Sequence, residues 1–557
     1  MFPARARFGK ITAVMTPDPI LQQALSAIRQ QHFADAIVLL EGLLNRQPGN
    51  IDARWLLVKT LESAANPQGA EDQLRQLLLH MKKNLPAIDQ VAAYVRQRGY
   101  PLKHVLTAYS KYIETKPGSA NAAFNYAFNL ARDGQFEKSI EAYKRALKCG
   151  IDAPEEVHLN IANIYMDHLH ASEQAQAHLQ QAIKLNPAYA SAYYNLGNLS
   201  EQLGDRPGAS ENFEKALQLD PGNDSALARL ADTKVFSDQD DPLLTQLASR
   251  AQDSRSSDLH MALGKAYEQV GRFDLAWQHF NVANAQDRKC NPAYSREKTE
   301  SMFAELKKQY SDEAMLQRDD SVNAPVFIAG MFRSGSTLLE QVLASHSRFV
   351  AGGESEFFPR LVAKAFPAYP QGLDSIPASK LHTWRKSYEA HTRKIVGPAQ
   401  RLTDKRPDNF LYAGLIKALV PSARFVFTDR DWRDIATSIY SVRLGHSQPY
   451  ATRLDDIRHY IELQADLVQF WAELLGPDLR IIRYEDLVQQ PQDTVSGLLQ
   501  WLGESWEDSC LSFHELKNSV RTASVWQVRE PLHSKSIGRW RNYEQPFVDA
   551  FGESIKT

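Results

Sequence analysis

The stretch Pro325-Val-Phe-Ile-Ala-Gly-Met-Phe-Arg-Ser-Gly-Ser-Thr-Leu-Leu-Glu-Gln341 decides the fold of the second half of this chain. Its apolar run after the proline is short, as expected of a buried strand in a parallel sheet. Gly330 and Gly335 then bracket a tight loop with the G-x-x-x-x-G spacing of a phosphate-binding loop. Backbone N–H groups of such a loop, together with the N-terminus of the following helix, favour anions. The sequence therefore predicts a strand, an anion-binding loop and a helix.

The loop differs from that of a nucleoside triphosphatase. Ser336 stands where the lysine of such a loop would be, and an arginine, Arg333, lies inside the loop. The expected ligand is therefore an anion other than the γ-phosphate of ATP with its Mg²⁺.

The composition excludes several classes of protein. The 557 residues suffice for two to four domains. The 64 Lys and Arg residues balance the 66 Asp and Glu residues, which argues against a nucleic-acid or membrane-surface protein. The three cysteines are far apart, so the spacing predicts neither a disulfide framework nor a zinc site and favours a reducing compartment.

Targeting signals are also missing from the sequence. The N-terminus is basic but lacks the apolar segment of a signal peptide. No run of 18 apolar residues suggests a transmembrane helix. We therefore expect a cytoplasmic protein with no membrane insertion.

The first half has an internal repeat. Ala182-Ile-Lys-Leu-Asn-Pro187 is echoed 34 residues later by Ala216-Leu-Gln-Leu-Asp-Pro221. A period near 34 with helical spacing is the signature of tetratricopeptide (TPR) repeats, in which a proline ends the second helix. We expect roughly six or seven repeats over about residues 20–290, with generic helical hairpins as the alternative. Such an array offers a concave surface for a peptide or protein partner.

The second half alternates strands with helices. Short apolar runs recur after the first strand, at 348–352, 423–428 and 479–484, and helical patterns occur at 411–420, 432–442 and 456–475. This alternation predicts an α/β domain with a mostly parallel sheet, whose site lies at the carboxyl ends of the strands. We expect an all-α TPR solenoid over 1–290, a connecting helix and linker over 291–324, and a P-loop-like α/β domain over 325–557.

The loop also resembles a known family. Arg333-Ser-Gly-Ser-Thr337 is similar to the 5′-phosphosulfate loop of sulfotransferases, which use 3′-phosphoadenosine 5′-phosphosulfate (PAPS) as sulfonate donor. The resemblance implies that this loop holds the phosphosulfate through Arg333, Ser334, Gly335, Ser336 and Thr337.

Two later motifs carry the implied chemistry. Glu354 follows Arg333 by 21 residues, the spacing at which tyrosylprotein sulfotransferases carry their catalytic base. Gly353 departs from their Gly-Glu-Glu context, but the base itself is kept. Lys405, in Lys-Arg-Pro407, resembles the lysine that contacts the transferring sulfonate in this family. The reaction needs a cation there, because charge builds on the leaving phosphate. The alternatives are a helix-capping carboxylate and an exposed lysine.

Two further motifs resemble the nucleotide site. Arg430, after a strand, and Ser438, eight residues on, are similar to the family's 3′-phosphate contacts. Arg430 paired with a neighbouring aspartate is the alternative. Tyr484, in Tyr-Glu-Asp-Leu487, resembles a nucleotide contact.

The last motif lies near the C-terminus. Ser524-Val-Trp-Gln-Val-Arg529 and the later Gly-Arg539-Trp match the C-terminal loop of the tyrosylprotein sulfotransferases. Ser524 takes the place of their transition-state serine, and Arg539 that of a lysine on the nucleotide. The whole chain resembles bacterial proteins in which TPR repeats precede a sulfotransferase domain.

The resemblance implies a PAPS-dependent transfer of sulfonate to a hydroxyl, most simply that of a protein or peptide tyrosine, without a metal. Glu354, Lys405, Ser524 and Arg333 would be catalytic, and the TPR groove would hold the acceptor. A sugar or small-molecule acceptor, an inactive nucleotide-binding scaffold and a P-loop kinase are the alternatives. The sequence leaves a homodimer open.

Overall fold

The computed structural model describes residues 18–310, 324–373, 376–393, 395–397, 400–445, 447–516, 518–522 and 524–556. The N-terminal residues 1–17 and residues 311–323 of the predicted connecting segment lie outside these residues. The chain forms two compact units, the first ending at Ala192 and the second beginning at Tyr193.

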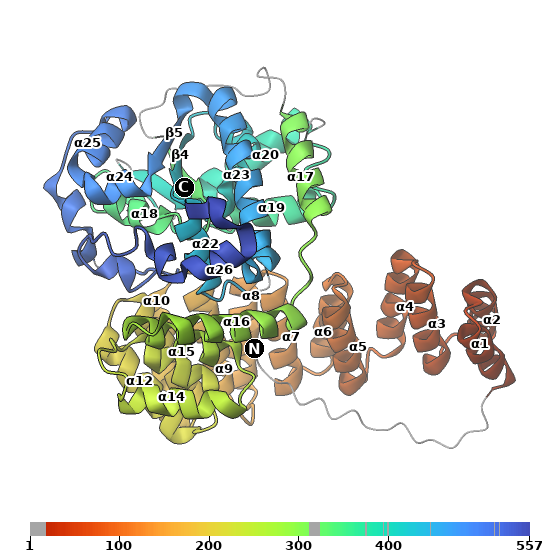
Figure 1. Cartoon of the computed structure of the whole chain (residues 1–557). Helices are drawn as coiled ribbons and strands as arrows, with labels where there is room; N and C mark the ends of the chain where they lie inside the picture. The colour runs from red at the N-terminus through yellow and green to blue at the C-terminus, as the bar shows by residue number, and fades with distance from the viewer. Residues whose placement is uncertain are drawn as a thin grey trace. The chain divides into compact units, whose positions relative to one another are not determined.

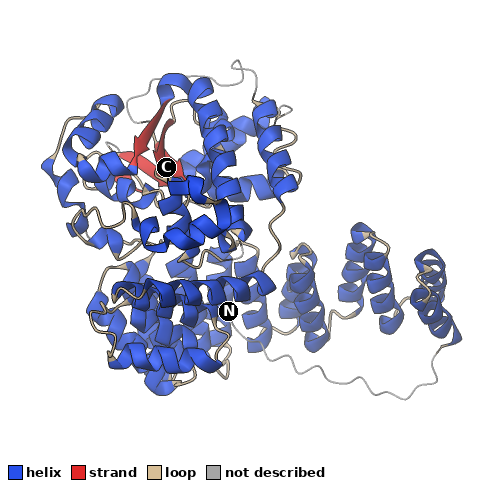
Figure 2. Cartoon of the chain, viewed as in Figure 1, coloured by secondary structure: helices blue, strands red, loops and turns tan. Residues whose placement is uncertain are grey.

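The first half is built of helices, as the repeat pattern predicts (Figure 1, Figure 2). Consecutive helices pack against each other from α1 to α10 and from α12 to α16. They are α1 (Pro19–Arg29), α2 (Phe33–Arg46), α3 (Ile51–Ser63), α4 (Pro67–His80), α5 (Leu85–Arg98), α6 (Lys103–Thr115), α7 (Ala120–Arg132), α8 (Phe136–Lys148), α9 (Pro154–Asp167), α10 (Ser172–Leu185), α11 (Ala190–Gln202), α12 (Arg206–Leu219), α13 (Asp224–Asp232), α14 (Pro242–Asp253), α15 (Ser257–Gln269) and α16 (Phe273–Cys290). Within the described residues, no helix has both the length and the apolar character that a membrane crossing needs.

Small residues let the helices of a pair approach closely. A Cβ atom on Gly197 of α11 would lie 2.6 Å from the ring of Phe213 in α12. One on Gly264 of α15 would lie 2.4 Å from the ring of Phe280 in α16. The same glycine–phenylalanine contact thus recurs in two repeats, which explains why the sequence pattern reserves these positions.

The second half contains a five-stranded sheet of order β2-β3-β1-β4-β5, and all its pairings are parallel. The predicted α/β fold is therefore confirmed (Figure 2). The strands are β1 (Val326–Gly330), β2 (Phe349–Ala351), β3 (Arg401–Lys405), β4 (Arg424–Asp429) and β5 (Leu479–Arg483). The connecting helices are α17 (Arg296–Gln309), α18 (Ser336–Ala344), α19 (Phe357–Ala365), α20 (Ala378–Thr392), α21 (Ala413–Leu419), α22 (Trp432–Tyr440), α23 (Leu454–Leu475), α24 (Tyr484–Gln489), α25 (Pro491–Leu502) and α26 (Glu544–Phe551). The short 3₁₀ helices are η2 (Pro407–Leu411), η3 (Pro449–Thr452), η4 (Gly476–Asp478), η5 (Asp508–Glu515), η6 (Gln527–Arg529), η7 (Arg539–Tyr543) and η8 (Glu553–Lys556).

Each face of the sheet has its own apolar core. On one face, Phe327 of β1 belongs to a large cluster that also contains Phe280 of α16. On the other face, Ile328 of β1 packs with Leu339 of α18. This alternation along β1 buries both faces and directs the loop after Gly330 to the carboxyl edge of the sheet.

The last repeat helix shares its core with the α/β domain. Besides the packing of Phe280, the Asn284 side chain donates a hydrogen bond to the backbone oxygen of Tyr440 at 2.9 Å. Trp277 stacks on the Tyr440 ring with centroids 4.8 Å apart. Repeat helix α16 is therefore built into the second unit.

Candidate active site

The loop between β1 and α18 has an unusual backbone. Arg333 has φ of 72°, in the left-handed region that non-glycine residues rarely adopt. Gly335, the N-cap of α18, has φ of 98°, and a Cβ there would come 2.6 Å from the Tyr484 side chain. Glycine is therefore required at this position. Strained positions of this kind, such as Arg333, concentrate at functional sites.

The Arg333 guanidinium donates hydrogen bonds to two other predicted site residues, Ser438 and Ser524. Its Nε donates to Ser438 Oγ at 2.9 Å, and its Nη1 donates to Ser524 Oγ. Its Nη2 donates to Gln527 Oε1 at 2.7 Å. The sequence predicted Arg333, Ser438 and Ser524 as parts of one site, although they are up to 191 residues apart.

Arg430 lies beside Arg333 and contacts the backbone of the loop. It is 8% exposed, and its Nη1 donates to the backbone oxygen of Arg333 at 3.0 Å. Its Nη2 donates to the backbone oxygen of Ser536. The guanidinium lies over the ring of Tyr484, 4.4 Å from the centroid. Tyr484 thus contacts both the loop glycine and Arg430.

The cluster concentrates positive charge. Burial and the nearby cations of Arg430 and Arg539 lower the pKa of Arg333 to about 10. Burial also lowers the pKa of Arg430, with Arg539 acting in the same direction and Asp434 against it. Within the described residues, no carboxylate forms an ion pair with Arg333, and Asp434 is 4.0 Å from Arg430. This arrangement suits a bound anion.

A second group lies at the ends of β2 and β3. The Lys405 side chain is 1% exposed, and its Nζ donates to Glu354 Oε1 at 2.7 Å. The Glu354 side chain is 34% exposed. Glu356, two residues after Glu354, pairs with Arg406 at 2.6 Å and is more exposed. A carboxylate open to solvent and held by a buried ammonium can meet an incoming hydroxyl group.

A buried acid, Glu340, lies next to the Glu354–Lys405 pair. Glu340 of α18 is 3% exposed, and its Oε1 accepts hydrogen bonds from the Gly353 backbone N–H at 3.0 Å and from Thr403 Oγ1 at 3.2 Å. Burial raises the pKa of Glu340 to about 7, although Lys405 opposes the shift. Glu340 therefore fixes the turn that carries Glu354.

The other predicted loop and nucleotide residues lie as follows. Ser334 is fully buried; its Oγ donates to the Met331 backbone oxygen at 2.7 Å and lies 2.6 Å from Thr428 Oγ1. Ser336 begins α18 and is buried, and Thr337 Oγ1 donates to Thr522 Oγ1 at 3.4 Å. Arg539 forms a fork with Glu268 of α15, at 2.5 Å for each nitrogen–oxygen pair. Arg433, three residues after Arg430, pairs with Asp431 and lies over the Trp540 ring.

Three residues of this region were missed from the sequence. Gln527 lies within the quoted Ser524 motif, so its position was visible but its role was not. Glu340 lies in the helix after the loop, where an acidic side chain has no distinguishing local pattern. Glu268 lies in a repeat helix, and nothing in its neighbourhood points to a site almost 300 residues away.

Models of two protein families match stretches of this chain. Residues 325–508 match the model of the sulfotransferase family. Tetratricopeptide repeat models match residues 27–93 and 190–223, and a further TPR model matches 172–204. The first of these stretches includes helices that had few repeat markers in the sequence.

Relatives of both parts are known. A protein of Aquifex aeolicus described as uncharacterized is 26% identical over 399 residues, covering 68% of this chain and 52% of the relative. The protein-tyrosine sulfotransferase of Drosophila melanogaster is 24% identical over 39% of this chain and 46% of its own length. Protein-tyrosine sulfotransferase 2 of Gallus gallus is also 24% identical, over 39% of this chain and 62% of its own length. The chain thus spans about half the length of the first two relatives.

Two solved structures are similar to part of this chain. The sulfotransferase domain of the Synechococcus PCC 7002 olefin synthase is 18% identical, with a TM-score of 0.32, over 42% of this chain and 98% of that domain. The MamA protein is 21% identical, with a TM-score of 0.23, over 38% of this chain and 93% of its own. From the family models, residues 325–508 of this chain form a domain of the sulfotransferase family, preceded by tetratricopeptide repeats.

Proposed function

We propose that this protein transfers a sulfonate group from PAPS to the hydroxyl of a tyrosine in a protein or peptide. The observation that carries the proposal is the pair of cations at the ends of β1 and β4. Arg333 donates to hydroxyl and amide oxygens and Arg430 to backbone oxygens, and Asp434, 4.0 Å from Arg430, offsets only part of the charge. Among the described residues, the negative charge that would fully balance the two cations is therefore missing. A phosphate or sulfonate group would supply that missing charge.

The donor would be held along the carboxyl edge of the sheet. Backbone N–H groups of the loop and of the α18 N-terminus suit the 5′-phosphosulfate, with Arg333, Ser336 and Thr337 beside them. Arg430 and Ser438 would bind the 3′-phosphate, and Tyr484 would contact the nucleotide. Ser334 would act differently from the sequence-based expectation: its buried hydroxyl ties the loop to Thr428.

The Glu354–Lys405 pair at the ends of β2 and β3 would perform the transfer. Glu354 would take the proton of the acceptor hydroxyl as its oxygen attacks sulfur. The bond between sulfur and the 5′-phosphate oxygen then breaks, and 3′,5′-ADP leaves. Lys405 has three N–H donors and uses one on Glu354 in this structure, so it could also stabilise the charge that develops on the leaving oxygen. Ser524, held by Arg333, would donate to the sulfonate.

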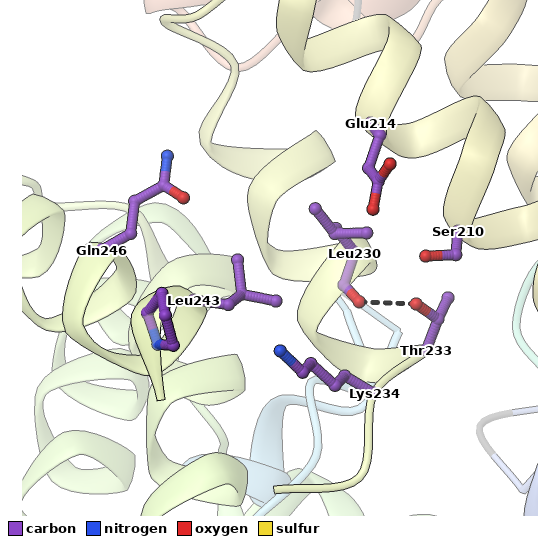
Figure 3. A pocket seen from close by; sticks show the side chains of 8 residues that line it. Ser210, Glu214, Leu230, Thr233, Lys234, Leu243 and Gln246 are labelled. Carbon is purple, nitrogen blue, oxygen red and sulfur yellow. Dashed lines mark hydrogen bonds between the residues drawn. The ribbon is translucent and has the colours of Figure 1, made fainter. Parts of the chain in front are cut away.

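The repeats support a peptide acceptor. A hollow of about 530 Å³ opens on helices α12–α14, lined by polar and apolar side chains (Figure 3). It includes Glu214 and Lys234, and the Thr233 hydroxyl beside it donates to the Leu230 backbone oxygen at 2.7 Å. Mixed lining of this kind suits an extended peptide better than a single sugar ring.

Calorimetric titration tests the donor site. We expect the protein to bind 3′,5′-ADP more tightly than 5′-AMP or ATP, because only the first presents a 3′-phosphate to Arg430. Preference for ATP, or no binding, would exclude the proposal. With PAPS labelled at sulfur, the label should appear on a tyrosine peptide and not on the same peptide with phenylalanine. If the label appeared on a sugar instead, the proposed acceptor would be wrong, but the proposed sulfonate transfer would stand.

A further inference from the structure

The repeats directly hold a third cation of this region, Arg539. Arg539 of η7 directs its Nε and Nη2 at the two carboxylate oxygens of Glu268, each at 2.5 Å. Nη2 also donates to Ser441 Oγ at 3.0 Å. Glu268 lies near the end of repeat helix α15, outside the residues that match the sulfotransferase family. Fork pairing of this kind fixes both the position and the plane of a guanidinium.

Arg539 interacts electrostatically with Arg333 and Arg430 of the candidate anion site. Its charge lowers the pKa of both Arg333 and Arg430, so the three guanidiniums lie within interacting distance. The backbone on either side of Arg539 is fixed as well, because the N–H groups of Gly538 and Trp540 donate to Asp434 at 2.7 and 3.0 Å. A third cation beside two others is unfavourable unless a carboxylate offsets part of the charge.

A second attachment anchors the segment that carries Ser524 and Gln527. The Val520 backbone N–H donates to the Gln202 backbone oxygen of α11 at 2.9 Å. The Arg206 guanidinium of α12 lies over the Trp526 ring, 4.8 Å from its centroid. Both segments that complete the cluster around Arg333 therefore rest on repeat helices.

We propose that Glu268 is a positioning residue for the donor site, and that repeats α11–α16 are a structural part of that site. Glu268 holds Arg539 in the cluster while no ligand is bound, and it leaves Arg333 and Arg430 to attract the anion. This inference rests on the proposed function, since it takes the ligand to be the nucleotide of PAPS. The sulfotransferase half then depends on a repeat side chain for its affinity, beyond its dependence on the repeats for stability.

Variants of the full chain test the inference. Glu268→Gln removes the charge with little change of shape, and Arg539→Gln removes its partner. Asp258→Asn is the matched control, because Asp258 lies on the same helix and pairs with Arg443 of the α/β domain at 2.8 Å. We expect Glu268→Gln and Arg539→Gln each to weaken 3′,5′-ADP binding about tenfold, the scale of one charged hydrogen bond. The double variant should lose no more than either single one, and Asp258→Asn should bind within about twofold of the parent.

Kinetics separate positioning from a general loss of structure. Glu268→Gln should raise KM for PAPS and leave kcat nearly unchanged. Equal loss in Glu268→Gln and Asp258→Asn, additive losses in the double variant, or unchanged 3′,5′-ADP binding in Glu268→Gln would each overturn the inference.

A readout without nucleotide keeps the inference separate from the proposed function. Hydrogen exchange at the Gly538 and Trp540 amides should become faster in Glu268→Gln and stay at the parent rate in Asp258→Asn. If exchange rises but the parent chain does not bind 3′,5′-ADP, the proposed function fails and the positioning of Arg539 stands. Unchanged exchange in Glu268→Gln overturns the positioning, whatever the nucleotide result.

Discussion

The cations at the carboxyl edge of the sheet fall into two kinds. After β1 and β4, Arg333 and Arg430 donate to hydroxyl, amide and carbonyl oxygens. At and after the end of β3, Lys405 pairs with Glu354 at 2.7 Å, and Arg406 pairs with Glu356 at 2.6 Å. The first kind donates to neutral partners, with the nearest paired carboxylate, Asp434, 4.0 Å from Arg430, whereas the second kind is held by close carboxylates.

The difference separates the tasks of the two groups. A buried cation with neutral partners retains its attraction for an external anion, so its natural role is binding. A cation paired with a carboxylate instead holds that carboxylate in place, and its natural role is to prepare a reacting group. Changes in the two groups should therefore have different kinetic effects.

The largest expected effect is on turnover. Glu354→Ala should lower kcat by about two to four orders of magnitude, the scale of a general base, and leave 3′,5′-ADP binding nearly intact. Glu356→Ala is the control, because Glu356 lies two residues on and pairs with Arg406 instead of Lys405. Steady-state rates and calorimetry measure the two quantities. Unchanged turnover in Glu354→Ala, or equal losses in both variants, would refute the role of Glu354.

The second effect is on binding. Arg430→Gln should weaken 3′,5′-ADP binding by about 10- to 100-fold, since a charged hydrogen bond contributes about 1.5–3 kcal/mol. Binding of 5′-AMP should change much less, because that nucleotide has no 3′-phosphate. Arg433→Gln is the control: Arg433 lies three residues on, but it pairs with Asp431 and Trp540. The comparison between the groups fails if Arg430→Gln weakens both nucleotides equally.

The smallest effect concerns the dependence of stability on pH. Burial raises the folded-state pKa of Glu340 to about 7, against an ordinary value of 4.5. Its folded state binds a proton more tightly than its unfolded state, so this group makes the protein less stable as pH rises from 4.5 through 7. Glu340→Gln removes that loss. Relative to the parent, the variant should therefore gain about 1–3 kcal/mol between pH 5 and pH 8.

Urea unfolding at the two pH values measures this gain. Asp404 and Lys405 lie close to Glu340, and burial, with a contribution from the Glu340 charge, raises the pKa of Asp404 to about 7. The difference between the two proteins therefore measures Glu340 together with its effect on Asp404. Glu507→Gln is the control, because a hydrogen bond from Ser347 lowers the pKa of Glu507 below its usual value. That group does not titrate between pH 5 and 8, and a flat difference is expected. A flat difference for Glu340→Gln as well would show that Glu340 is not the titrating group.

Most of the fold could be predicted from the sequence, because apolar runs mark buried strands. The exception is β3, whose residues Arg401-Leu-Thr-Asp-Lys405 are mostly polar although the strand is buried. Its polar side chains are satisfied by distant partners: Arg401 donates to the Leu502 backbone oxygen, and Lys405 pairs with Glu354. Only the motif around Lys405 marked this strand, since hydropathy does not record such partners.

Sequence motifs grouped some of the candidate site residues before the structure was known. Arg333, Ser438 and Ser524 meet in space as the motifs indicated. Glu268 was not predictable, because its role arises from a contact between a repeat helix and a C-terminal loop. The partner of Arg539 is fixed by tertiary packing alone, and no local pattern in either segment encodes it. The roles of all these residues remain predictions until the variants are measured.

The apolar core that α16 shares with β1 also affects how the protein unfolds. Phe280 and Phe327 belong to one apolar cluster, whereas α1–α9 are stabilised by separate local clusters. Repeats that contact only their neighbours can open one at a time, but residues that share a core unfold together. The last repeats and the sulfotransferase domain should therefore form one cooperative folding unit. The boundary between this unit and the part that unfolds separately then lies within the repeat array.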